Sequence, residues 1–205
     1  MRLPACPRDV YHPPTDACAY AHRHAPEASP SVILPIRKLG DPVLKSPAKP
    51  VASFDDALRK LAQDMVETMY DAEGVGLAGP QVGLSQRLFV FDDGESGPKF
   101  MANPELSGGQ GEVTIDEGCL SIPGPYYPTM RFERIRCRGR DLQGAPYEIE
   151  AEGLLARIFQ HETDHLDGML YIDRLDDQAR RSVLAELRQI ELGLIEPRER
   201  HHASE

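Results

Sequence analysis

Two histidines four residues apart, His161 and His165, enclose a glutamate in the segment HETDH. If this segment is helical, both imidazoles lie on one face, about one turn apart, and can reach the same metal ion. Glu162 then points about 100° around the helix axis. That direction puts its carboxylate beside the ion, where a general base for an attacking water is needed. The pattern therefore predicts a hydrolytic metal site.

A metal site of this kind needs a third protein ligand. One group of HExxH enzymes takes a third histidine six residues after the second, but that position is Tyr171 in this chain. A carboxylate further along, Glu186 or Glu191, is one alternative. A thiolate is the other, since Cys119 lies in the segment EGCLS, 42 residues before the first histidine. The residues by themselves leave these alternatives open.

A glycine-rich segment, GVGLAGPQ, runs from Gly74 to Gln81. It formally contains GxGxxG, but a dinucleotide-binding turn needs a strand before it and a helix after it, whereas here the helix comes first. We interpret the segment as a loop whose backbone, at Val75 and Gly76, comes close to a bound peptide. Gln81 ends the loop with an amide that can donate a hydrogen bond.

Taken in order, the segments GVGLAGPQ, EGCLS and QHETDHLDG resemble the three signature segments of peptide deformylases. The resemblance extends from about Val32 to Leu175. It implies a metal ion held by Cys119, His161 and His165, with a water in the fourth position. The metal implied is one divalent ion, Fe²⁺ in the cell, with Zn²⁺, Ni²⁺ or Co²⁺ able to occupy the site in a purified sample.

The same resemblance implies a reaction and its catalytic groups. Glu162 would act as general base and then as general acid, while the Gln81 side chain and the backbone N–H of Leu120 would face the developing oxyanion. The reaction would remove the formyl group from the N-terminal formylmethionine of nascent polypeptides and release formate. The partners implied are N-formylmethionyl peptides and the ribosome near its exit tunnel, with no DNA and no membrane.

Three residues of the HExxH helix are expected to bind substrate. Leu154 and Ile158 lie seven and three residues before His161, on the side that faces the metal, and could line an apolar pocket for the methionine side chain. Arg157 lies four residues before the histidine, so we expect it at the rim of that pocket. Its stem can cover apolar wall while its charged head stays in water.

Three other functions remain to be separated from this one. An HExxH peptidase would use one of the two downstream glutamates as third ligand. A cysteine hydrolase would use Cys119 as nucleophile with a histidine as base. A non-catalytic relative would bind formylated peptides without cleaving them.

Composition sets the class of protein. The chain has 205 residues, of which 40% are hydrophobic and 27% charged, with a formal net charge of −10. There is no run of about 18 apolar residues, which excludes a membrane-spanning helix. The negative charge argues against general nucleic-acid binding, which needs clustered Lys and Arg. The four cysteines form no CxxC pair and no secretory signal is evident, so we expect a cytoplasmic, bacterial-type protein with free thiols.

We expect three parts along the chain. Residues 1–30, rich in Pro, Ala and His, are typical of a disordered N-terminal extension. Residues 31–195 form a single metallohydrolase domain, and residues 196–205 form a C-terminal tail. The cysteines and histidines of the extension could in principle hold a metal, but their spacing matches no zinc-finger pattern.

The elements that must position the site follow from periodicity. Apolar residues at spacings of three and four predict an amphipathic helix capped by Ser53 and ending at about Glu73, with Gly74 as C-cap. Further helices are expected at about 153–166 and 177–194, and strands at 87–91, 100–102, 112–115, 134–138 and 147–150. The grouping predicts an α+β fold with antiparallel or mixed sheets packed around a central HExxH helix, together with an N-terminal amphipathic helix and a C-terminal helix.

Charged side chains in two of these strands carry a further expectation. Basic residues alternate in 134–138 and acidic residues in 147–150, which suits cross-strand ion pairs on an exposed face. The resemblance implies another ion pair, between Glu117 and Arg131. Gln160 is expected beside the site rather than on the metal.

Overall fold

The structure is a computed structural model that describes residues 31–95 and 97–198. The proposed extension 1–30, with its cysteines and histidines, lies outside the described residues, and so does most of the proposed tail. These two assignments stay predictions. No helix in the described part of the chain is long and apolar enough to cross a bilayer.

Five strands form one sheet in the order in which they occur in the chain. They are β1 (Gly76–Ala78), β2 (Leu88–Phe91), β3 (Lys99–Cys119), β4 (Ile122–Arg140) and β5 (Pro146–Glu152). Each pairs antiparallel with the next. Three α-helices accompany them among the described residues, which confirms the α+β class: α2 (Asp56–Asp71), α3 (Gly153–Leu166) and α4 (Asp177–Glu191).

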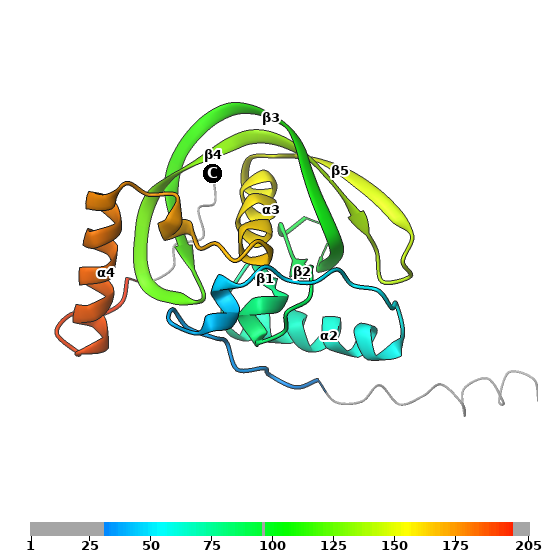
Figure 1. The fold of residues 1–205 in the computed structure, drawn as a ribbon, viewed down its shortest axis with the longest axis horizontal. Coiled ribbons are helices and arrows are strands. Elements are labelled where there is room, and N and C mark those ends of the chain that lie inside the picture. The colour runs from blue at the N-terminus through cyan, green and yellow to red at the C-terminus, as the bar shows by residue number, and fades with distance from the viewer. Residues whose placement is uncertain (1–30, 96, 199–205) are drawn as a thin grey trace, which may run out of the picture. The chain divides into compact units, whose positions relative to one another are not determined.

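The prediction of two separate strands at 100–102 and 112–115 is wrong, because both belong to the single long strand β3. Gly108 and Gly111, in the stretch between the two predicted strands, have φ of 67° and 65°. Gly108 lies at an irregularity in the pairing with β4 between Ser107 and Gln110, and Gly111 follows directly after it. An inserted residue at such a bulge bends a strand without ending it. Figure 1 shows the result, in which β3 and β4 arch over α3.

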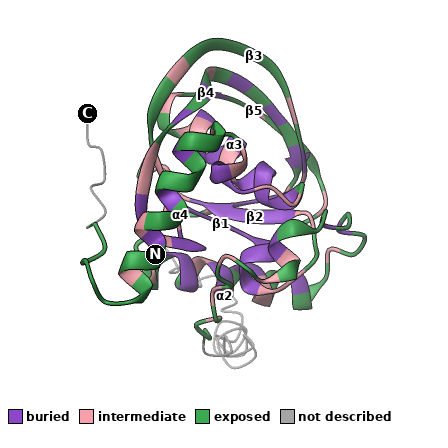
Figure 2. Ribbon diagram, turned by 60° about the vertical axis from the view of Figure 1, so that its left-hand side comes forward, coloured by how far each residue is buried: buried purple, intermediate pink, exposed green. Residues whose placement is uncertain are grey.

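The core is divided by β2, whose four residues are all buried. Successive side chains of a strand point to opposite faces. Accordingly, Leu88 and Val90 pack in the cluster that contains the apolar face of α2, whereas Phe89 and Phe91 pack against Phe159 of α3. The rings of Phe91 and Phe159 meet edge to face, with centroids 4.8 Å apart. The part of the sheet formed by β1 and β2 therefore packs against α3. It lies below this helix in Figures 1 and 2.

Both ends of α2 differ from the prediction. The N-cap is Asp55 rather than Ser53, and its carboxylate accepts a hydrogen bond from the backbone N–H of Leu58 at 3.0 Å. After the helix, the left-handed residue is Glu73, with φ of 53°, rather than Gly74. The glycine serves packing instead, since a Cβ on Gly74 would lie 2.9 Å from Leu120 Cδ1. The loop between α2 and β1 therefore packs against the EGCLS segment.

The last helix, α4, is also shorter than expected. It ends at Glu191 rather than near 194, and it buries Val183 and Leu187 while Leu184 stays 38% exposed. Its buried residues pack with Ile122 of β4 and with the 3₁₀ turn Tyr171–Asp173 that follows α3.

The expected ion pairs between β4 and β5 are confirmed. They join Arg134 to Glu152 at 2.9 Å, Arg136 to Glu150 at 2.7 Å and Arg138 to Glu148 at 3.1 Å. These pairs lie on the exposed outer face that Figure 2 shows in green. Pairs as exposed as these contribute little to stability. Cys137, between them in the sequence, points inward and is fully buried.

Candidate metal centre

Three donor atoms from two distant segments of the chain converge beneath the arch. Cys119 ends β3, while His161 and His165 lie one turn apart on α3. Cys119 Sγ is 3.3 Å from His165 Nε2, and the two imidazole rings have centroids 4.9 Å apart. One donor atom from each residue falls within 4.8 Å of the other two. The two carboxylates considered as alternative third ligands, those of Glu186 and Glu191, are not members of this cluster.

Both glutamates are engaged elsewhere. Glu186 forms an ion pair with Arg198 at 3.2 Å, and Glu191 lies 3.6 Å from Arg188 on the same helix. The helix α4 that carries them packs on β4. The structure therefore disfavours a carboxylate as third ligand.

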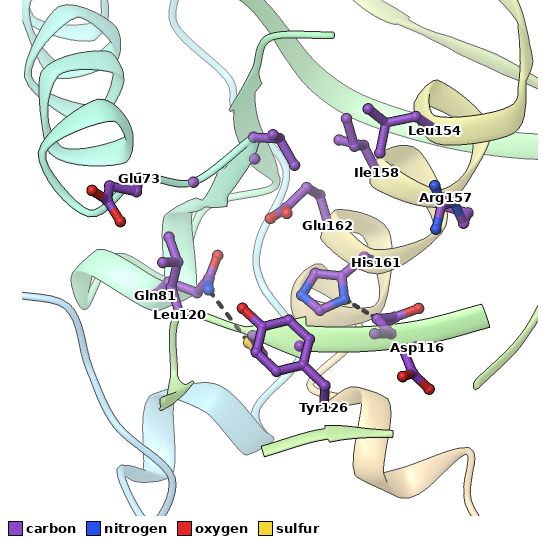
Figure 3. Close-up of a pocket in the computed structure, with 16 residues that line it drawn as sticks. Glu73, Gln81, Asp116, Leu120, Tyr126, Leu154, Arg157, Ile158, His161 and Glu162 are labelled. Carbon is purple, nitrogen blue, oxygen red and sulfur yellow. Dashed lines mark hydrogen bonds and ion pairs between the residues drawn. The ribbon is translucent and has the colours of Figure 1, made fainter. Parts of the chain in front are cut away.

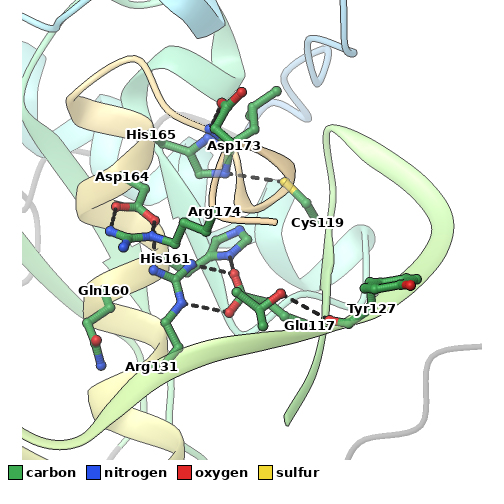
Figure 4. A network of polar contacts seen from close by, with 12 residues as sticks. Glu117, Cys119, Tyr127, Arg131, Gln160, His161, Asp164, His165, Asp173 and Arg174 are labelled. Atoms are coloured by element: carbon green, nitrogen blue, oxygen red, sulfur yellow. Dashed lines mark hydrogen bonds and ion pairs between the residues drawn. The ribbon is translucent and has the colours of Figure 1, made fainter. Parts of the chain in front are cut away.

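A chain of charged side chains orients the first histidine (Figure 4). His161 Nδ1 lies 2.6 Å from Glu117 Oε1, so a proton on Nδ1 is held by the carboxylate and Nε2 keeps its lone pair for a metal. Arg131 binds the same carboxylate through Nε at 2.8 Å, which confirms the ion pair that the resemblance implied. Arg131 Nη1 continues to Asp164 Oδ2 at 2.7 Å, and Asp164 in turn accepts from Arg174 Nε at 2.6 Å.

Sequence reasoning missed the last two members of this network of charged side chains, Asp164 and Arg174. The position of Asp164 inside HETDH is the one signal that could have drawn attention to it. Its partner Arg131 is fully buried, with a side chain only 1% exposed. Gln160, expected beside the site, makes two hydrogen bonds of 2.9 Å to the backbone of Phe132 and so ties α3 to β4.

Burial and neighbouring charges set the protonation of the cluster. Burial opposes ionisation of the Cys119 thiol, but the charge of His165 and hydrogen bonds from both rings outweigh it and hold its pKa well below the usual value. Burial likewise opposes charge on His161, while Glu117 and Cys119 raise its pKa. Burial also works against the ionised form of Glu117, yet Arg131 and His161 keep the pKa of that carboxyl far below its ordinary range. The lowered pKa favours a thiolate at Cys119, which is the form of cysteine that binds metal.

Glu162, the expected general base, is 3% exposed and projects into the pocket beside His161 (Figure 3). Its Oε2 is buried and has no hydrogen-bond partner among the described residues. Burial raises the pKa of its carboxyl to about 7. The backbone of Gly76 lies against this carboxylate, because a Cβ there would come within 2.4 Å of Glu162 Oε1.

The glycine-rich segment is more ordered than the predicted loop. It forms the short strand β1 and then a 3₁₀ turn, Gly79–Val82, with all four residues of the turn buried. The Gln81 side chain folds back to the residue before this turn, where its Oε1 accepts a hydrogen bond from the Ala78 N–H at 2.8 Å. Its Nε2 is thereby directed at Cys119 Sγ, 3.7 Å away, and at Ser121 Oγ, 3.4 Å away. Figure 3 shows this amide facing the sulfur.

A cavity of about 220 Å³ opens onto the cluster. Every residue expected to bind substrate lines it: Val75, Gly76, Leu154, Arg157 and Ile158. Glu162, Gln81 and Leu120 line it as well. Ile158 is almost fully buried, whereas Leu154 is 38% exposed.

Tyr126 also lines the cavity and was missed by sequence reasoning. Its ring lies on the backbone of Gly118, where a Cβ would approach Tyr126 Cε1 to 2.5 Å. Figure 3 shows Tyr126 among the residues that line the cavity. An aromatic residue seven positions after a cysteine carries no signal of its own, because only the turn between β3 and β4 brings them together.

The donor set fits a divalent metal ion. One sulfur and two ring nitrogens are the ligand types that Zn²⁺ and Fe²⁺ accept in proteins. The carboxylate of Glu117 fixes one ring from behind, as metal-ligating histidines usually require. Buried Glu162 Oε2, left without a partner within the described residues, suits a carboxylate that faces a bound water.

Comparison with known proteins decides the family. The family model described as polypeptide deformylase matches residues 33–181. The chain belongs to the polypeptide deformylase family. Enzymes of this family are metal-dependent hydrolases that remove the formyl group from an N-terminal methionine, and this chain is a hydrolase of that kind.

Individual deformylases are similar over most of the chain. A peptide deformylase of Acidothermus cellulolyticus is 50% identical over 160 residues, which cover 78% of this chain and 88% of that protein. The crystal structure of a peptide deformylase from Legionella pneumophila is 42% identical, with a TM-score of 0.75, and the match covers 81% of this chain and 100% of that one. For the crystal structure of the peptide deformylase from Thermus thermophilus the identity is 46% and the TM-score 0.73, with coverage of 80% and 100%.

Proposed function

We propose that Cys119, His161 and His165 hold one divalent metal ion and that the residues around them carry out deformylation of formylmethionyl peptides. The observation that supports this most directly is the convergence of one sulfur and two ring nitrogens within 4.8 Å. An ion bound there would polarise the formyl carbonyl and lower the pKa of a bound water to about 7.

Glu162 is the group that moves protons in this proposal. Its carboxylate is buried in the pocket next to His161, without a protein partner for Oε2 in the described part of the chain. It takes a proton from the attacking water and delivers it to the nitrogen of the departing methionine. The close backbone of Gly76 keeps the carboxylate from turning away.

Two donors stabilise the oxyanion that forms on the formyl group. The amide of Gln81 is directed by the hydrogen bond that Ala78 donates to its oxygen, so its N–H₂ faces the cysteine. The backbone N–H of Leu120 comes from the residue next to the cysteine and lines the same cavity. Loss of one such donor costs about 2.7–4 kcal/mol of transition-state stabilisation.

The apolar part of the cavity takes the methionine side chain. Ile158 and Leu154 supply one wall from α3, and Val75 lies across the cavity on the glycine-rich segment. The formyl group is the smallest acyl group, and the tight contact between Gly76 and Glu162 leaves little room for a larger one. Arg157 at the rim contacts the peptide rather than the reacting atoms.

The physiological ion is proposed to be Fe²⁺, with Zn²⁺, Ni²⁺ or Co²⁺ able to replace it, because a site with one soft and two borderline ligands accepts all four. Nascent chains are the substrate, so the enzyme would act in the cytoplasm, near the ribosomal exit tunnel. A net charge of −10 does not suit DNA or an anionic membrane surface as a partner.

The test combines anaerobic metal analysis with an assay for formate release from formyl-Met peptides. The unaltered protein should bind one ion and release formate, and a chelator should abolish release. Cys119→Ser should lose metal and activity, whereas Cys137→Ala, which changes a buried cysteine on β4 away from the cavity, should keep both.

Each rival function predicts a different result. A cysteine hydrolase would keep its activity after chelation. A peptidase with a glutamate ligand would keep its metal in the Cys119→Ser variant. A binding protein without catalysis would release no formate at any metal loading. Any of these outcomes would overturn the proposal.

A further inference from the structure

A short segment, residues 37–39, runs across both loops that carry the proposed oxyanion donors. The backbone N–H of Arg37 donates to the Gln81 carbonyl at 2.7 Å. Two residues later, the N–H of Leu39 donates to the Ser121 carbonyl at 2.9 Å. The segment therefore links the glycine-rich segment to EGCLS, although neither of its two hydrogen bonds involves a side chain.

Lys38, which lies between Arg37 and Leu39, adds a hydrogen bond from its side chain. Lys38 Nζ donates to the carbonyl oxygen of Leu120 at 2.8 Å. That oxygen belongs to the peptide unit joining Leu120 to Ser121, and the N–H of the same unit donates to Cys119 Sγ at 3.4 Å. One peptide unit thus has a cationic donor on its oxygen and the cysteine sulfur on its N–H.

Such an arrangement has a definite physical consequence. A cation at a carbonyl oxygen draws electron density from the peptide unit and makes its N–H a stronger donor, since linked hydrogen bonds polarise one another. A hydrogen bond to a ligating sulfur reduces the electron density that the sulfur gives to a metal. The same bond also limits rotation of the backbone at Leu120, whose own N–H points to the cavity in the proposed mechanism.

We propose that Lys38 is a positioning residue that acts through the Leu120–Ser121 peptide unit on the Cys119 sulfur and on the Leu120 oxyanion donor. This inference rests on the proposed metal site and oxyanion donors. Lys38 is exposed and is not among the residues that line the cavity in the described structure. It can therefore influence the reacting atoms without contacting the substrate.

The test uses the full-length protein loaded with Co²⁺, which reports on the sulfur through its thiolate-to-metal charge-transfer band. Lys38→Met should move this band to longer wavelength, because the sulfur becomes a stronger electron donor. It should also lower kcat about fivefold, the effect of losing roughly one hydrogen bond, and leave KM within about twofold. Lys38→Arg should restore band and kcat, since a guanidinium can donate to the same carbonyl.

The matched control is Lys49→Met. Lys49 is also exposed and also lies in a segment tied by backbone hydrogen bonds, here to Ser85 and Arg87. The Lys49→Met variant should leave the charge-transfer band, kcat and KM unchanged.

The proposal fails if Lys38→Met leaves the band in place, whatever happens to its thermal stability, because a merely structural lysine would behave in that way. It also fails if KM rises while kcat is kept, which would indicate direct contact with substrate. Failure of the proposed function itself would be seen separately, in unaltered protein that shows neither the charge-transfer band nor formate release.

Discussion

The backbone of Gly76 is in direct contact with the carboxylate of Glu162. A Cβ on the glycine would stand 2.4 Å from Oε1 and 2.9 Å from Cδ, closer than real Cβ atoms come to their neighbours. Gly76 does not have a positive φ, so its backbone conformation is open to alanine. The glycine is therefore required by the carboxylate beside it and not by the chain conformation.

Gly76→Ala should lower kcat about 100-fold, because displacing a catalytic group by about 1 Å costs that much. The metal content should not change, since the three atoms nearest to the added Cβ all belong to Glu162 and none to a proposed ligand. Formate release and metal analysis on the same sample measure both quantities.

A double-mutant cycle tests the cause of that loss. In the background of Glu162→Ala, which removes the carboxylate, Gly76→Ala should have no further effect on the residual rate. Additive losses in the cycle would show that alanine disturbs the substrate or the β1 strand rather than Glu162.

Glu117→Gln should weaken metal binding about 10- to 100-fold, the usual consequence of losing the carboxylate behind a ligating histidine. The reason is the 2.6 Å contact between Glu117 Oε1 and His161 Nδ1. Titration against a competing chelator measures the affinity. Glu148→Gln, in an ion pair on the outer face of β5, is the control and should bind metal normally. An unaltered affinity in Glu117→Gln would contradict the role given to this contact.

Asp164→Asn should reduce the free energy of unfolding by about 3 kcal/mol, because it leaves the buried charge of Arg131 with one fewer partner. Urea unfolding with chelator present excludes any contribution from bound metal. Asp56→Asn is the matched control, since that carboxylate also pairs with an arginine but is 98% exposed. It should change stability by less than about 0.5 kcal/mol. Equal effects of the two substitutions would argue against a stabilising role for the buried network.

Arg157→Ala should raise KM for formyl-Met peptides while kcat stays unchanged. The stem of Arg157 lines the cavity beside Ile158, and losing about one methylene contact corresponds to a roughly fourfold change in affinity. Arg157→Met keeps most of the stem and should raise KM less. Arg134→Ala, exposed on the outer face of β4, serves as the control. A normal KM for Arg157→Ala would remove this residue from the substrate site.

Local patterns predicted some local parts of the fold. The HExxH helix occupies the expected residues 153–166, because apolar spacing and a following glycine mark its limits over a few turns. The pairs between β4 and β5 also followed from alternation within short segments. The continuity of β3 did not follow from the sequence, because a glycine at a β-bulge cannot be told from a glycine at a turn by its residue type.

The sequence by itself determined that two histidines and a glutamate share one helix, and that a thiol and two carboxylates were candidates for the third ligand. Spacing could not choose among them, because the 41 residues between Cys119 and His161 leave the approach of the cysteine undefined. The tertiary structure places β3 over α3 and brings the sulfur to the rings, which supports the proposal that Cys119 is the third ligand. It also created the Asp164–Arg174 contact, the Tyr126 wall and the Lys38 bond, which depend on segments meeting in space and leave no pattern along the chain.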